Sequence, residues 1–143
     1  MNREHLKKKL SNLALSMFRK DFFGVYHGSL SAKTESNRFI INTKEAIFDD
    51  ISETNLIELY FKKDYRWKHA SIDSSIHYNI YSQVSDAKFI CYSMPPFTTA
   101  YALTNNTITP KDYFGYKAFG SIEIIDPKQF DDWYERAQSE IAY

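Results

Sequence analysis

The sequence predicts a single layered α/β domain with a mixed or antiparallel central sheet. Helix-type and strand-type patterns alternate along the 143 residues, which is typical of layered α/β architectures. A polar stretch over 31–37 joins two strand-type segments, and this indicates a hairpin with antiparallel pairing. The length suits one hydrophobic core, and no linker or internal repeat divides the chain. We therefore expect residues 1–143 to form one domain.

The N-terminal half contains one helix pattern and three strand patterns. Apolar residues recur at helical spacing over 3–20, and neither proline nor glycine interrupts them. Segment 23–33 has the glycines and serines of a turn, followed by a short strand. β-Branched and aromatic residues predict two further strands at 38–43 and 55–61. Apolar residues dominate both faces of 55–61, so we expect this strand to be covered on at least one side.

The stretch 71–103 is expected to contain a helix, a strand, a loop and a second helix. Apolar spacing predicts the first helix over 73–84, and a short hydrophobic run predicts the strand over 88–92. Pro96 fits the first position of the second helix, over 97–103. Loops that follow a strand are where many α/β folds place their chemistry, so this stretch is the first candidate for a functional site.

The last part of the chain predicts one more strand and one more helix. Segment 113–125 contains two glycines and ends in a strand-like run. The final helix has strong start signals, because Asp126 can cap it, Pro127 suits its first turn, and Gln129 completes a capping-box pattern. We expect this helix to begin directly after Asp126.

Composition excludes several functional classes. Eighteen Lys and Arg residues balance eighteen Asp and Glu residues, whereas nucleic-acid binding needs a basic excess, so we expect no nucleic-acid partner. The single cysteine permits neither a disulfide framework nor a Cys-x-x-Cys zinc pattern. The N-terminus lacks the apolar core of a signal peptide, and no segment approaches a membrane span. We therefore expect a soluble cytoplasmic protein without membrane insertion.

Three features could carry chemistry, and each has a structural alternative. The turn at Gly28 can present backbone N–H groups to an anion, although most such turns are only turns. Asp73 and His77 share a helix face, where they could form an acid/base dyad, a metal half-site or, most commonly, a surface pair. Cys91 follows a hydrophobic run, and a buried inert thiol is its default interpretation. A Cys91–His77 nucleophilic pair lacks any local signature.

The order of several short segments resembles the class II aldolase/adducin N-terminal domain family. Family members have a G-N-hydrophobic-S turn, a Thr-Ser/Thr-Gly turn, a P-S-S-E-x-x-x-H helix start, a strand that enters H-x-H, and an F-G-T/S segment. The matching segments here are, in order, 28–31, 43–45, 70–81, 89–100 and 119–121. No single motif is intact, and the serial agreement over nearly the whole chain carries the resemblance. It implies a three-layer αβα fold.

The resemblance also implies a metal site, which this sequence has largely lost. In active members the two histidines of H-x-H bind a divalent metal, usually zinc, and here Cys91 and Ser93 occupy those positions. A thiolate can bind zinc, but a serine hydroxyl is a poor ligand. The third histidine belongs to a segment beyond Tyr143, so the chain looks short at its C-terminus. We expect no cofactor, with Cys91 as the one metal-ligand candidate.

Other family positions are partly retained. Asp73 stands at the acid/base glutamate and keeps the carboxylate on a shorter side chain. In the family, the two turns and the serines cradle a substrate phosphate. Ser29 replaces the asparagine of this cradle, Ile72 replaces the second serine, and Glu45 replaces a glycine. The resemblance therefore implies the following anion-binding set: Gly28, Ser29, Thr43, Lys44 and Ser71.

Two functions remain open at this point. The first is a non-catalytic binding or assembly module, as in the adducin branch of the family, and the replaced metal ligands favour it. The second is a diverged metal-dependent aldolase or epimerase that acts on a phosphorylated sugar, with zinc or another divalent metal. In both cases the expected small-molecule partner is a sugar phosphate or another anion. The resemblance also implies a homo-oligomer.

Overall fold

A computed structural model describes residues 2–142 and contains a four-stranded antiparallel sheet. The strand order is β3-β2-β1-β4, and each neighbouring pair is antiparallel. The predicted hairpin is confirmed as β1–β2, and the expected mixed or antiparallel sheet is antiparallel. The strands are β1 (Ser29–Glu35), β2 (Arg38–Asn42), β3 (Leu56–Tyr60) and β4 (Phe89–Tyr92).

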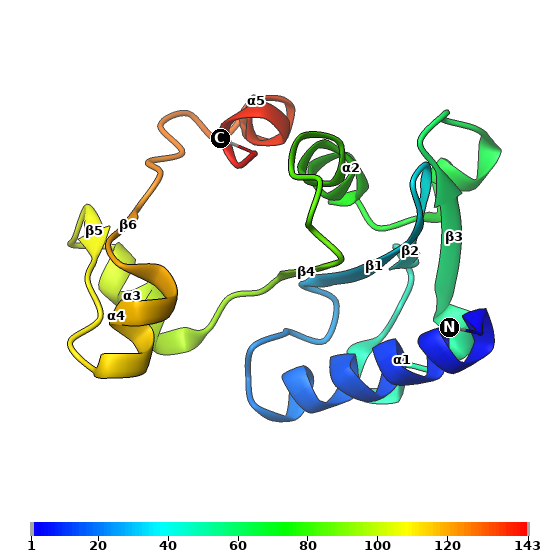
Figure 1. Cartoon of the computed structure of the whole chain (residues 1–143), viewed down its shortest axis with the longest axis horizontal. Helices are drawn as coiled ribbons and strands as arrows, with labels where there is room; N and C mark the ends of the chain where they lie inside the picture. Colours follow the sequence, from blue (N-terminus) through cyan, green and yellow to red (C-terminus); the bar gives the residue numbers. More distant parts are fainter. Residues whose placement is uncertain (1, 143) are drawn as a thin grey trace.

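Helices cover both faces of this sheet, which confirms the three-layer αβα arrangement (Figure 1). Helix α1 (Arg3–Arg19) lies on one face, while α2 (Ser74–Gln83) and α5 (Trp133–Glu140) lie side by side on the other. Short 3-10 turns complete the domain at Phe48–Asp50, Glu53–Asn55 and Tyr65–His69. The predicted bounds of α1 and α2 agree with these helices to within about a turn.

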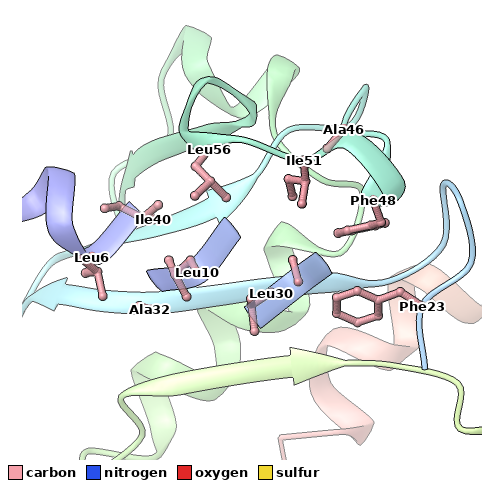
Figure 2. Packing of buried hydrophobic residues seen from close by; sticks show 11 residues of the cluster. Leu6, Leu10, Phe23, Leu30, Ala32, Ile40, Ala46, Phe48, Ile51 and Leu56 are labelled. Atoms are coloured by element: carbon pink, nitrogen blue, oxygen red, sulfur yellow. The ribbon is translucent and has the colours of Figure 1, made fainter. Parts of the chain in front are cut away.

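Alternation along the strands builds two hydrophobic cores. Leu6 and Leu10 of α1 pack in one cluster with Leu30 and Ile40 of the sheet (Figure 2). On the opposite face, Phe39 belongs to a second cluster beneath α2. Because successive strand residues point to opposite faces, a single strand such as β2 contributes to both cores. The sheet is therefore packed against helices on both faces.

A small lobe leaves the layers after β4 and returns to α5 (Figure 1). It contains two helices and a two-stranded antiparallel ribbon, and no residue between 82 and 136 is buried. Helix α4 was not expected from the sequence; Asp112 caps it by accepting a hydrogen bond from the Gly115 N–H at 2.8 Å. The lobe elements are α3 (Pro96–Ala102), β5 (Thr107–Ile108), α4 (Tyr113–Phe119) and β6 (Ile122–Glu123).

The predicted start of the last helix is wrong. Helix α5 begins at Trp133, and the Asp126 carboxylate instead accepts a hydrogen bond from the Lys128 N–H at 2.8 Å. Lys128 has a positive φ of 55°, which no helix residue adopts. The Arg136 guanidinium also donates to two carbonyls in this segment. Asp126 therefore forms an Asx-type turn instead of the predicted capping box. Aspartate side chains can bond to nearby backbone N–H groups in either structure.

Candidate functional site

A small cavity lies where the segment before β1, the end of β2 and the start of α2 meet. Its volume is about 110 Å³, which is room for several water molecules or a phosphate-sized group. Residues beyond β4 and on α5 close its remaining side. The lining residues are Tyr26, His27, Gly28, Asn42, Thr43, Lys44, Ala46, Ser71, Ile72, Asp73, Tyr92, Met94 and Tyr134.

Backbone pairing brings the end of β2 beside the start of α2. Thr43 forms an isolated antiparallel bridge with Ala70, and the Ser71 N–H donates to the Asn42 carbonyl at 2.9 Å. The Lys44 N–H donates to the His69 carbonyl at 3.0 Å. These bonds use the backbone donors of Lys44 and Ser71 internally. Lys44 and Ser71 therefore line the cavity without these two donors.

Gly28 is required by the geometry beside this cavity. Its φ is +125°, and an added Cβ would lie 2.4 Å from a ring carbon of Phe23. Phe23 in turn packs on Phe48 with 4.6 Å between ring centroids. A side chain at position 28 would therefore strain the backbone and displace a core aromatic ring.

Asp73 is the one buried carboxylate of the cavity wall. Its side chain is 4% exposed, its Oδ2 accepts a hydrogen bond from Ser29 Oγ at 2.8 Å, and its Oδ1 is buried without a partner among the described residues. Burial raises the pKa of Asp73, and the Ser29 bond only partly opposes this. A carboxyl group of this kind can exchange a proton with a molecule in the cavity.

The Asp73 charge contributes to the raised pKa of two tyrosines in the cavity wall. Burial is the main cause that raises the pKa of Tyr92 and of Tyr134, and the Asp73 carboxylate adds to it in both. Tyr92 pairs in register with Ser29 across the β1–β4 ladder. The two phenols therefore stay protonated near Asp73 and are hydrogen-bond donors for an oxygen-rich ligand.

The site continues inward as a ladder of buried polar side chains. Ser29 Oγ lies 2.8 Å from His77 Nε2, and Ser31 Oγ lies 2.7 Å from His77 Nδ1 and 2.7 Å from the Tyr81 hydroxyl. His77 is completely buried. Burial lowers the pKa of His77 to about 3, so the ring is neutral, and burial raises the pKa of Tyr81 to about 12.

The favoured interpretation of Asp73 and His77 as a surface pair is wrong. Both are buried, and Ser29 bridges them. The ladder follows from matched spacing, because two strand residues advance about 6.8 Å and four helix residues advance about 6 Å. Serines at 29 and 31, opposite polar residues at 73, 77 and 81, carried this signal in the sequence.

The predicted anion-binding residues separate into two groups. Gly28, Thr43, Lys44 and Ser71 line the cavity together with Asp73. Ser29 does not line it, because its side chain is fully buried between Asp73 and His77. The cavity also contains residues that the sequence did not single out: Tyr26, His27, Asn42 and Tyr134.

Cys91 lies outside the cavity, and the expectation of a buried thiol is wrong. The residue is exposed, although nearby atoms desolvate the sulfur enough to raise the thiol pKa. A catalytic zinc needs about three protein ligands. Nowhere in residues 2–142 do three His, Cys, Asp or Glu side chains lie close enough to hold a metal ion. The described residues around Cys91 therefore do not fit the zinc site of the aldolase pattern.

A family model described as class II aldolase and adducin N-terminal domain matches residues 8–142. The chain belongs to this family. A comparison with curated protein sequences found no significant match. None of the helices between residues 2 and 142 is long and apolar enough to cross a membrane.

Solved structures share the class II aldolase fold at low sequence identity. An L-fuculose-1-phosphate aldolase from Thermus thermophilus superposes with a TM-score of 0.86 at 17% identity, over 97% of this chain and 70% of that one. YgbL from Escherichia coli, a putative aldolase/epimerase/decarboxylase, gives 0.76 at 14% identity with the same two shares. YgbL from Klebsiella pneumoniae gives 0.62 at 16% identity, over 71% of this chain and half of that one.

Proposed function

We propose that this class II aldolase-family domain is a non-catalytic module that binds a small sugar phosphate in the cavity at Gly28, Thr43, Lys44 and Ser71. The grouping of these four residues around one cavity is the observation that carries the proposal. Lys44 supplies a positive charge, and no carboxylate of residues 2–142 forms an ion pair with it. The hydroxyls of Thr43 and Ser71 supply donors for phosphate oxygens.

Lys44→Gln is expected to weaken the binding of L-fuculose 1-phosphate about tenfold, which corresponds to about 1.4 kcal/mol. The reason is the loss of a charge-assisted contact while the length of the side chain is nearly kept. Isothermal titration calorimetry with this sugar phosphate and with inorganic phosphate measures the effect. Lys62→Gln is the matched control, because that exposed lysine lies outside the cavity. Equal affinity of Lys44→Gln and Lys62→Gln for the sugar phosphate, or no binding at millimolar ligand, would contradict the proposal.

A diverged aldolase or epimerase is the second candidate, and Asp73 is the observation that favours it. Asp73 lines the cavity, is buried and has a raised pKa, and its Oδ1 has no hydrogen-bond partner within residues 2–142. These are properties of a general acid/base. Against it stands the poor fit of the described residues to a metal.

Purified protein separates the two candidates through metal content and turnover. The binding-module proposal expects no bound zinc or manganese after purification without chelators, and no cleavage of L-fuculose 1-phosphate. Near-stoichiometric metal together with cleavage that Asp73→Asn abolishes would establish the second candidate. Because Asn keeps the size of Asp, a folding defect is not expected to confuse this result.

We further propose that the lobe after β4 packs against other copies of the chain in a homo-oligomer. Large apolar side chains are exposed on it, including Phe97 at 92% and Phe114 at 81%. Exposed apolar surface on this scale is typical of protein interfaces.

The exposed unpaired thiol of Cys91 suits a reducing compartment, so we propose that the protein is cytoplasmic.

Phe114→Ser is expected to shift the assembly toward monomer, weakening association about 5- to 30-fold, or 1–2 kcal/mol. Truncating an interface aromatic removes buried apolar area on each copy. Light scattering after size-exclusion chromatography, over a dilution series, measures the shift. Tyr65→Ser is the control, since this tyrosine is 73% exposed but lies outside the lobe. A wild-type protein that stays monomeric at high concentration would contradict the assembly.

A further inference from the structure

The buried ladder forms one continuous chain of hydrogen bonds that starts at the cavity. It runs from Asp73 through Ser29, His77 and Ser31 to Tyr81, with every link between 2.7 and 2.8 Å. We propose that this chain has two directions, and that the protonation of Asp73 at the cavity sets which ring nitrogen of His77 carries the hydrogen. His77 then responds to Asp73 through Ser29, whichever of the two proposed functions the domain has.

With Asp73 ionised, all links point toward its carboxylate. The carboxylate can only accept, so Ser29 donates to Oδ2, and the Ser29 oxygen then accepts from His77. His77 must therefore carry its hydrogen on Nε2. Its bare Nδ1 accepts from Ser31, and Ser31 accepts from the Tyr81 hydroxyl. Each link in this state has one donor and one acceptor.

With Asp73 protonated, the same chain can run the other way. The carboxyl O–H donates to Ser29, Ser29 donates to a bare Nε2, and His77 carries its hydrogen on Nδ1. Ser31 then donates to Tyr81, whose hydroxyl turns to the Lys88 carbonyl at 3.5 Å. The Lys88 oxygen is the acceptor that this direction needs at its end. The only net change is one proton, which Asp73 takes from solvent through the cavity.

Burial couples the links to one another. Ser29, Ser31 and His77 are fully buried, so a reversed hydroxyl has no water to bond with. A link with two donors or two acceptors leaves a buried polar group unpaired, at a cost of about 1–3 kcal/mol. Protonation of Asp73 also favours the reversed direction. A proton on Oδ2 can be donated to Ser29, whereas Oδ1 has no partner within residues 2–142. The two uniform directions are therefore favoured over mixed ones.

Charged and titratable groups from four other segments surround the chain. At the cavity end, Asp73 faces His27 from the turn before β1, Lys44 from the end of β2, Tyr92 from β4 and Tyr134 from α5. At the inner end, Lys33 of β1 lies 5.8 Å from the centroid of the Tyr81 ring. Tyr92 and Tyr134 are protonated phenols, because burial raises the pKa of both and the Asp73 charge adds to the shift.

Nitrogen NMR of the wild-type protein tests the switch directly. A protonated and a bare ring nitrogen of histidine have well-separated ¹⁵N shifts, and the Asp73 carboxyl ¹³C shift reports its own titration. We expect the hydrogen of His77 to move from Nε2 to Nδ1 as pH falls, with the midpoint of the Asp73 titration. A tautomer that stays the same while Asp73 titrates would overturn the proposal. So would an Asp73 that does not titrate while the domain is folded, or a His77 ring that becomes doubly protonated with Asp73.

Ser29→Ala separates the coupling from a merely structural role. Without the bridging hydroxyl, the His77 tautomer is expected to stop following Asp73, and the Asp73 titration midpoint is expected to rise because a hydrogen bond to the carboxylate is lost. Ser82→Ala is the matched control, because Ser82 lies on the same helix with its side chain in solvent and bonds only to the Tyr78 carbonyl. The proposal would be contradicted if the His77 tautomer still followed Asp73 in Ser29→Ala. It would also be contradicted if Ser82→Ala removed this coupling.

Discussion

Acidification from pH 6.5 to about 3 is expected to remove up to about 4–5 kcal/mol of the free energy of unfolding through His77 alone. The pKa of this ring is about 3 in the folded domain and about 6.5 in the unfolded chain. Between these values the unfolded chain binds a proton that the folded domain does not. Stability therefore falls as pH falls, by about 1.4 kcal/mol per unit. Urea unfolding at a series of pH values from 7.5 downward measures the slope.

Asp73 acts in the opposite direction over part of this range. Its pKa is raised in the folded domain, so between the unfolded value and the folded value the folded state binds the extra proton. That contribution stabilises the domain as pH falls, and it makes the measured slope shallower there. His77→Gln is expected to remove most of the acid sensitivity, whereas His69→Gln, in an exposed 3-10 turn, should keep it. An unchanged slope in His77→Gln would rule out this explanation.

His77→Ala is expected to cost about 3–5 kcal/mol at neutral pH, a large share of the stability of a typical domain. The ring fills a fully buried site between β1 and α2, and its loss leaves a cavity. It also removes one of the two hydrogen bonds of Ser29 and one of those of Ser31, and each lost bond adds about 0.5–1.5 kcal/mol. The midpoint of urea unfolding, with an unchanged m-value, measures the loss.

Two further variants control this result. His69→Ala is expected to stay within about 0.5 kcal/mol of the wild type, because its side chain is exposed. Tyr81→Phe removes only the last hydroxyl of the chain and should cost about 1–2 kcal/mol, since one buried hydrogen bond is lost and the ring remains. If His77→Ala cost no more than Tyr81→Phe, the central position of His77 would be refuted.

Local patterns predicted the elements whose stability is mainly local. The α1 helix, the β1–β2 hairpin and the start of α3 at Pro96 agree with the structure, because spacing, turn residues and proline act within a few residues. The start of α5 failed although its signals were strong. Asp126 could form either a helix cap or an Asx-type turn, and the structure contains the turn. Arg136 stabilises this segment by donating to the Pro127 and Gln129 carbonyls.

The candidate site was only partly predictable. Thr43, Ser71 and Asp73, which the resemblance to the family singled out, line one cavity, and their binding role stays a prediction. The resemblance did not predict that the Ser29 side chain is turned inward, where it bonds to Asp73 and His77. The exposure of Cys91 was also missed, since a hydrophobic run beside it suggested a core, whereas the lobe after β4 leaves the sheet edge uncovered.

The sequence by itself determined helices α1, α2 and α3, the β1–β2 hairpin and the family, because these depend on spacing and on residues near one another in the chain. Only the tertiary structure decided which polar groups are buried and what they bond to. Ser31 and Tyr81 are 50 positions apart, yet they share a hydrogen bond. Burial removes water from such groups and shifts their pKa values, while the partners that replace the water set the direction of each hydrogen bond. For Asp73 and His77, burial turned an expected surface pair into a buried pair that Ser29 bridges beside the cavity.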